Sequence, residues 1–147
     1  MMEVSCTMLI RRPATEVFQA LVDPAITTNF WFTKSSGPLT AGATVQWDWE
    51  MYGASAQIKV INLVTDEKIS FEWDQPARRV DFILKTTDEG TYVLARESGY
   101  AETGDALLAA IKDSTGGFTT VLDGMKAWLE HGIRLNLVAD KFRDVKF

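Results

Sequence analysis

The chain has 147 residues, of which 46% are hydrophobic, and a formal net charge of −5. That length predicts one domain, residues 1–147, with a core that needs no disulfide or metal. The acidic balance argues against nucleic acid or anionic membranes as partners, because both attract basic surfaces. Cys6 is the only cysteine, so it has no partner for an internal disulfide. No segment resembles a signal peptide or a membrane span, and we expect a cytoplasmic protein without membrane insertion.

The first quarter of the chain predicts one strand and two short helices. Apolar and polar residues alternate over residues 3–11, which is typical of a half-buried strand. Pro13 stands at the start of a short amphipathic helix, and Asp23-Pro24 ends it. Residues 26–32 predict a second short helix or turn that ends in three consecutive aromatic residues.

Between residues 44 and 97 the sequence predicts five strands joined by short turns. The alternating segments are residues 44–51, 55–64, 69–74, 80–85 and 91–97. Turn residues such as Tyr52-Gly53 separate consecutive segments, so neighbouring strands are expected to pair antiparallel.

The same pattern makes three local predictions. Residues 35–42, rich in serine, glycine and proline, predict a loop. Met51 extends the apolar face of the first of these strands. In the next strand Val64 shares a face with Val60, whereas Leu63 lies on the opposite face.

A glycine pair divides the helical pattern near the C-terminus. Residues 105–112 predict a short helical segment, and Gly116-Gly117 predicts an interruption that acts as a hinge or cap. The residues that follow, to Gly132, predict one long amphipathic helix. Its apolar stripe comprises Phe118, Val121, Leu122, Met125, Trp128, Leu129, Ile133 and Leu135. An antiparallel sheet with one long helix is an α+β architecture, and such a helix over a curved sheet tends to leave a cavity.

Four segments carry a resemblance to a known family. Residues Ile10 to Pro24 are similar to the opening of the SRPBCC (START/Bet v 1-like) superfamily and, more narrowly, of its Hsp90-ATPase-activator-homologue branch. Trp31-Phe32, Glu97 to Tyr100 and Gly117 to Gly132 lie where that branch has similar residues. The resemblance implies a helix-grip fold: a curved antiparallel sheet of about six strands wrapped on the long C-terminal helix, with two short helices after the first strand. It also implies a hydrophobic cavity between sheet and helix.

The candidate ligand-binding residues are bulky apolar side chains on the predicted inner faces. They are Trp31, Phe32, Trp47, Trp49, Phe71, Trp73 and Phe82 before the long helix, and Phe118, Leu122, Met125 and Leu129 within it. Flat rings suit the wall of a pocket for an aromatic or acyl ligand. Ordinary core packing is the alternative for each of them, and Trp31-Phe32 fits a lid or plain packing equally well.

Glu97 is the polar residue that the pattern singles out. The resemblance favours a last strand in which Val93, Ala95 and Glu97 face the helix, which would place a carboxylate in an apolar cavity. Such a group could orient a ligand hydroxyl or act as a general acid or base, with Tyr100 as a hydrogen-bond donor. The alternative is a strand-end glutamate that reaches solvent or pairs with an arginine.

Three functional hypotheses follow. The first is a non-enzymatic protein that binds a small hydrophobic or amphipathic ligand, because no catalytic set is evident. The second is a cyclase- or lyase-like enzyme that uses Glu97, and the third is a co-chaperone-like module with a protein partner. His131 is the only histidine and is expected to be solvated, and one histidine with one cysteine predicts neither a metal site nor a cofactor.

Overall fold

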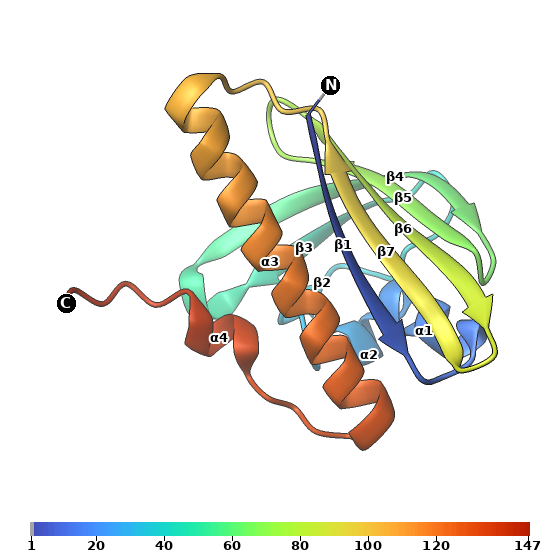
Figure 1. Cartoon of the computed structure of the whole chain (residues 1–147). Helices are drawn as coiled ribbons and strands as arrows, with labels where there is room; N and C mark the ends of the chain where they lie inside the picture. Colours follow the sequence, from blue (N-terminus) through green and yellow to red (C-terminus); the bar gives the residue numbers. More distant parts are fainter. Residues whose placement is uncertain (1) are drawn as a thin grey trace.

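In a computed structural model, which describes residues 2–147, one long helix crosses a face of a curved sheet (Figure 1). The elements in chain order are β1 (Glu3–Ile10), α1 (Ala14–Val22), α2 (Pro24–Thr27), β2 (Lys34–Ser35), β3 (Thr44–Trp49), the 3-10 turn η1 (Glu50–Tyr52), β4 (Ala54–Val64), β5 (Lys68–Trp73), β6 (Arg78–Thr87), β7 (Gly90–Ser98), α3 (Gly104–His131) and α4 (Leu137–Lys141). Both short helices, α1 and α2, cover one end of the sheet.

The sheet is antiparallel throughout, with seven strands in the order β1-β7-β6-β5-β4-β3-β2. Each strand from β2 to β7 pairs with the next along the chain, as the hairpin turns predict. The exception is β1, which pairs with β7 at the far edge and so brings the N-terminal strand beneath α3. The α+β helix-grip architecture predicted from the sequence is therefore confirmed.

The seventh strand comes from a segment for which the sequence predicts a loop. In β2, Lys34 pairs with Asp48 and Ser35 pairs with Trp47. A strand of two residues is too short to show alternation, so periodicity could not reveal it. The prediction of a loop was wrong at Ser35, and correct for the residues that follow as far as Gly42.

The predicted interruption at Gly116-Gly117 was also wrong, because α3 runs unbroken through both glycines. A glycine costs a helix about 1 kcal/mol relative to alanine, which packing on either side can offset. Ser114 hydrogen-bonds to a buried residue of the sheet, and Phe118 is buried in the core. Contacts on both sides of the glycines therefore hold the helix.

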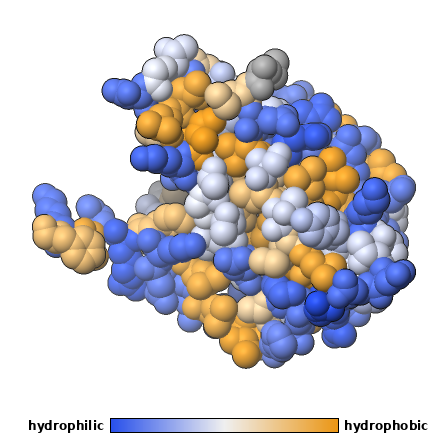
Figure 2. Space-filling model, viewed as in Figure 1, coloured by the Kyte–Doolittle hydropathy of each residue, from blue (hydrophilic) through white to orange (hydrophobic). Residues whose placement is uncertain are grey.

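Figure 2 shows the surface hollowed between the first turns of α3 and the C-terminal segment.

The long helix ends earlier than its predicted apolar stripe. Gly132 adopts a left-handed conformation with φ of +64°, and its N–H bonds to the Trp128 carbonyl. This is a common way for a helix to stop, because glycine has no Cβ to clash. Ile133 and Leu135 lie beyond that end and are 51% and 47% exposed. Their assignment to the stripe was therefore wrong.

Two predicted strand faces were wrong near the strand ends. The pairing of β4 with β5 shifts register between Val60 and Asn62, and this bulge reverses the faces that follow. Leu63 consequently packs against the core, whereas Val64 is 37% exposed. Met51 lies in η1 instead of in a strand, and its side chain is exposed.

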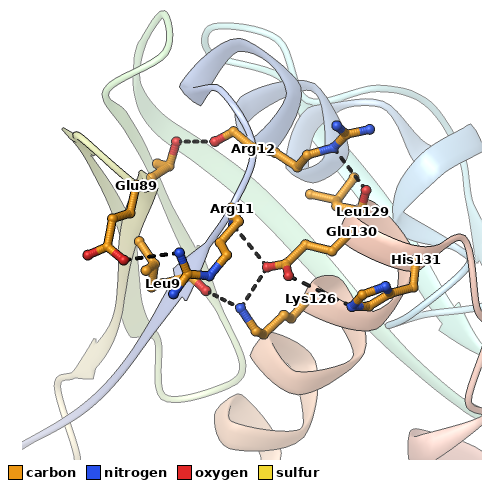
Figure 3. Close-up of polar contacts among 9 residues, drawn as sticks. Leu9, Arg11, Arg12, Glu89, Lys126, Leu129, Glu130 and His131 are labelled. Carbon is orange, nitrogen blue, oxygen red and sulfur yellow. Dashed lines mark hydrogen bonds and ion pairs between the residues drawn. The ribbon is translucent and has the colours of Figure 1, made fainter.

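The C-terminal end of α3 is joined to the end of β1 by the polar network in Figure 3. The Lys126 ammonium donates to the Leu9 carbonyl at 2.7 Å and to the Glu130 carboxylate at 2.6 Å. The backbone N–H of Arg11 donates to the same carboxylate at 2.9 Å. His131 lies 3.9 Å from Glu130 and points outward, as expected for a solvated histidine. Glu130 therefore connects the helix to the strand beneath it.

Replacing Glu130 by glutamine tests this connection. Burial opposes ionisation of Glu130, but bonds from the Arg11 N–H and Lys126 outweigh it and lower the pKa of the carboxyl. We expect Glu130→Gln to lose about 1–2 kcal/mol at pH 7, which lowers the melting temperature by about 3–6 °C. Because the folded-state pKa is lowered, the stabilisation is present above the ordinary pKa of 4.5 and is lost as pH falls through the folded value.

Thermal unfolding of both proteins between pH 3 and pH 7 measures this difference. Glu67→Gln, at an exposed position in the β4–β5 turn, is the matched control and should have little effect. A loss for Glu130→Gln that stays constant over the whole range would contradict the ionic role.

Candidate functional site

A cleft of about 500 Å³ opens between the β3–β4 hairpin, the middle of α3 and the segment around α4. Aromatic side chains form its floor: Trp31, Trp49, Trp73 and Phe118. The ring centroids of Trp31 and Trp73 are 6.1 Å apart, and those of Trp73 and Phe118 are 6.0 Å apart. These spacings are within the range of favourable aromatic pairs, so the floor is a packed apolar surface that a flat or acyl group could cover.

The other aromatic candidates lie beneath this floor. Phe32, Trp47, Phe71 and Phe82 are each at most 1% exposed and do not line the cleft. Phe32 stacks on Trp47 with 4.2 Å between the ring centroids. For these four residues the structure shows the core packing that the sequence leaves open, and they support the floor from below. Trp31 is buried as well, but one side of it reaches the cleft.

Only one face of α3 contributes to the cleft. Phe118 lines it together with Val121, which the sequence assigns only to the apolar stripe of the helix. Leu122 and Met125 point into the core and are almost fully buried. Leu129 packs against the core near the C-terminal end of the helix, away from the cleft.

Glu97, near the end of β7, points into the interior and is 1% exposed. One carboxylate oxygen accepts from the Trp73 indole N–H at 2.7 Å. The other accepts from the Tyr100 hydroxyl at 2.9 Å and from the Ser114 hydroxyl at 2.5 Å. A buried carboxylate needs such donors, because burial removes its water. The predicted inward orientation is confirmed. The alternative of a glutamate that reaches solvent was wrong, whereas the arginine partner that it also allowed is present as Arg78.

An arginine accompanies this carboxylate. A terminal guanidinium nitrogen of Arg78 lies 3.8 Å from Glu97, and another pairs with Glu102. The guanidinium also covers the Tyr100 ring, with its carbon 4.6 Å from the ring centroid. The positive charge of Arg78 is therefore already paired within the protein.

The local electrostatics keep Tyr100 a hydrogen-bond donor. Burial and the nearby Glu97 carboxylate raise the pKa of Tyr100 to about 12, so its hydroxyl is protonated at neutral pH. Burial also raises the pKa of Asp74 on the cleft wall, and the carboxylates of Glu97 and Asp113 add to this shift. Carboxylates therefore outnumber cations at the polar end of the cleft.

The arrangement favours hydrogen bonding over proton transfer. Three donors already occupy most of the acceptor sites of the Glu97 carboxylate, and the oxygen that accepts from Tyr100 and Ser114 has no lone pair left for a proton from a ligand. Within residues 2–147 no three His, Cys, Asp or Glu side chains gather in a way that could hold a metal ion. No helix in this part of the chain is long and apolar enough to cross a membrane.

Several lining residues were missed by the sequence prediction. Asp113 and Ser114 lie between the predicted helical segment, residues 105–112, and the interruption predicted at Gly116-Gly117, and one helix continued through the glycines would have included them. Tyr52 lies in a turn of η1. Val138 and Phe142 come from the C-terminal segment, for which no element was predicted. No local pattern marks these last three residues.

Comparison with known proteins identifies the family. Residues 11–130 match the sequence model of the Activator of Hsp90 ATPase homolog 1-like protein family. The chain belongs to this family. The match confirms the resemblance seen in the sequence. It begins just after β1 and contains the other six strands of the sheet and nearly all of α3. No curated protein matches the sequence.

Solved structures of this fold support the assignment. Protein SSP2350 from Staphylococcus saprophyticus is 27% identical, with a TM-score of 0.82, over 91% of this chain and 96% of that one. The Aha1 dimer from Colwellia psychrerythraea is 20% identical, with a TM-score of 0.77, over 90% and 98% of the two chains. DynU16, from the dynemicin biosynthetic locus, is 21% identical, with a TM-score of 0.81, over 90% of this chain and 48% of its own. The last two likenesses show the fold alone.

Removing one donor to Glu97 should destabilise the protein measurably. We expect Ser114→Ala to cost about 1–3 kcal/mol, because it leaves a buried carboxylate short of a bond. Alanine has a higher helix propensity than serine, so helix propensity by itself would make Ser114→Ala stabilising and would partly offset the loss of stability. Ser98→Ala, in the adjoining strand β7, is the matched control and should be nearly neutral. Urea unfolding measures both, and equal stabilities would contradict the role given to Ser114.

Proposed function

We propose that this protein binds a small amphipathic ligand in the cleft between the β3–β4 hairpin and α3. The observation that carries the proposal is an aromatic floor beside a buried carboxylate that three hydrogen bonds hold. Its volume of about 500 Å³ is in the range of small-molecule sites. The rings of Trp49, Trp73 and Phe118 would cover the apolar part of the ligand, since flat groups pack well on such surfaces.

The polar end of the cleft favours a ligand that donates hydrogen bonds. Asp74 and Asp113 line the cleft, and neither side chain has a hydrogen bond within the described residues. Arg78 also lines the cleft, but its guanidinium is already paired with Glu97 and Glu102. A hydroxyl or an amine would therefore fit this end better than a carboxylate would.

A binding panel tests the proposal. It contains a saturated fatty acid, a flavonoid, a polyketide-like aromatic and a long-chain alkylamine. Three lining tryptophans, Trp31, Trp49 and Trp73, should report binding as a change in intrinsic fluorescence. We expect saturable binding of the hydroxylated aromatic or the amine, accompanied by a rise in melting temperature. A flat response to the whole panel would overturn the proposal.

A variant that fills the cleft provides the control for location. Ala56 of β4 lines the cleft, and Ala56→Phe would place a ring in it. We expect at least about a tenfold loss of affinity for the ligand found in the panel. Ala109→Phe adds the same ring at an exposed position of α3 and should bind as the wild type does. Equal affinity of Ala56→Phe and wild type would place binding elsewhere.

A cyclase-like enzyme is the second candidate. It is favoured by the Glu97 carboxylate on the cleft wall, which accepts from the protonated hydroxyl of Tyr100 although Tyr100 itself does not line the cleft, and DynU16 of the dynemicin biosynthetic locus has the same fold. If the protein is purely a binding protein, mass spectrometry should recover the polyketide-like aromatic unchanged after incubation. A new product that disappears in Glu97→Gln, with ligand affinity retained, would favour the enzyme.

A further inference from the structure

The chain returns to the mouth of the cleft after the long helix. Gly132 and Asn136 both adopt left-handed conformations, with φ of +64° and +58°. Between them the chain leaves α3, and α4 then lies beside the β3–β4 hairpin (Figure 1). This segment follows residue 130, where the match to the family ends. It therefore lies outside the part of the chain that the family model matches.

Two side chains of this returning segment line the cleft. Val138 of α4 is half-buried, and Phe142, just after α4, is 41% exposed. Every other lining residue lies within the range matched by the family. The segment thus adds an apolar wall opposite the aromatic floor.

Polar contacts hold this wall in place. The Tyr52 hydroxyl, itself on the cleft surface, lies 2.5 Å from the Val138 carbonyl oxygen and 3.2 Å from that of Ala139. The last carbonyls of a helix have no partner within it, so a tyrosine hydroxyl is an effective donor to them. The Lys141 ammonium donates to the Thr120 hydroxyl of α3 at 2.9 Å.

The other contacts of this segment are few: the Arg134 guanidinium donates to the Asn29 side chain, and Leu137 packs near Gly124 of α3. From Gly132 to the C-terminus, only the three residues Leu137 to Ala139 are not exposed. A helix of five residues does not persist by itself, because too few hydrogen bonds offset the cost of forming it. Segments with few buried apolar contacts open locally at low cost. The wall can therefore leave the cleft while the sheet and α3 stay folded.

We propose that residues 133–147 form a gate over the cleft, that the Tyr52 hydroxyl holds the gate closed, and that Val138 and Phe142 limit the size of the ligand. The inference rests on the proposed function, since a gate requires a ligand to admit. A closed gate slows both uptake and release of the ligand, so opening it raises both rate constants. Loss of an ordinary contact with the ligand raises only the dissociation rate constant.

The kinetic test uses N-phenyl-1-naphthylamine, a neutral aromatic probe whose fluorescence rises in apolar surroundings. Stopped-flow measurements compare wild type with Tyr52→Phe, which lacks the hydroxyl but keeps the ring. We expect the association and dissociation rate constants both to rise about threefold to tenfold, the change that loss of one hydrogen bond predicts. Tyr92→Phe is the matched control, because Tyr92 is exposed in β7 outside the cleft, and its rate constants should equal those of wild type.

Ligand size gives a second, independent readout. Phe142→Ala should shift preference towards a larger probe, perylene, by about threefold or more relative to N-phenyl-1-naphthylamine, because the wall recedes. Phe147→Ala, at the fully exposed C-terminal residue, should leave this ratio unchanged.

The outcomes separate the two proposals. Wild type that binds neither probe nor any member of the ligand panel would overturn the proposed function, and the gate with it. Saturable binding with unchanged rate constants in Tyr52→Phe would overturn the gate alone. A rise in the dissociation rate constant alone would also overturn it, since Tyr52 would then be only a contact.

Discussion

The Glu97 carboxylate is a charge buried between sheet and helix, and the position of α3 depends on how its charge is satisfied. Its donors come from three places in the chain: Trp73 at the end of β5, Tyr100 after β7 and Ser114 in α3. An unsatisfied carboxylate at this depth would be costly, so these three side chains must converge in the folded state. That convergence fixes the distance between the helix and the sheet at one end of the cleft.

The other end of α3 is fixed by a second carboxylate. Glu130 accepts from the Arg11 N–H and from Lys126, and thereby joins the last turn of the helix to the end of β1. Between these two anchors the helix packs closely on the sheet through Leu122 and Met125. The space left open is therefore confined to the Ser114 side, where the β3–β4 hairpin and the C-terminal segment complete the walls. One end of the cleft is aromatic and the other is rich in carboxylates, which is why the proposed ligand is amphipathic.

Much of the fold could be predicted because it depends on local periodicity. Alternation identified five of the strands between residues 44 and 97, and the inward face of Glu97 agreed with the family resemblance. The errors share a different cause. The two-residue strand β2, the bulge after Val60 and the continuity of α3 through Gly116-Gly117 are all decided by partners distant in the sequence. Local propensity does not depend on residues distant in the sequence, so it cannot predict the effect of such partners.

The sequence by itself determined which side chains face inward along the regular parts of most strands and of α3, because alternation and helical spacing assign residues to faces. For β7 the family resemblance chose between the two faces, and the bulge after Val60 reversed the predicted faces. The sequence also determined the family, through an ordered set of segments that no single motif replaces. Only the tertiary structure decided how deep each inward residue lies: Trp47 and Trp73 share a face predicted from the same pattern, yet Trp47 is core and Trp73 lines the cleft. Depth depends on sheet curvature and on where α3 rests, and that position follows from contacts between Glu97 and Ser114 across the fold. The return of Val138 and Phe142 to the cleft was decided in the same way, by contacts with Tyr52 that no local pattern contains.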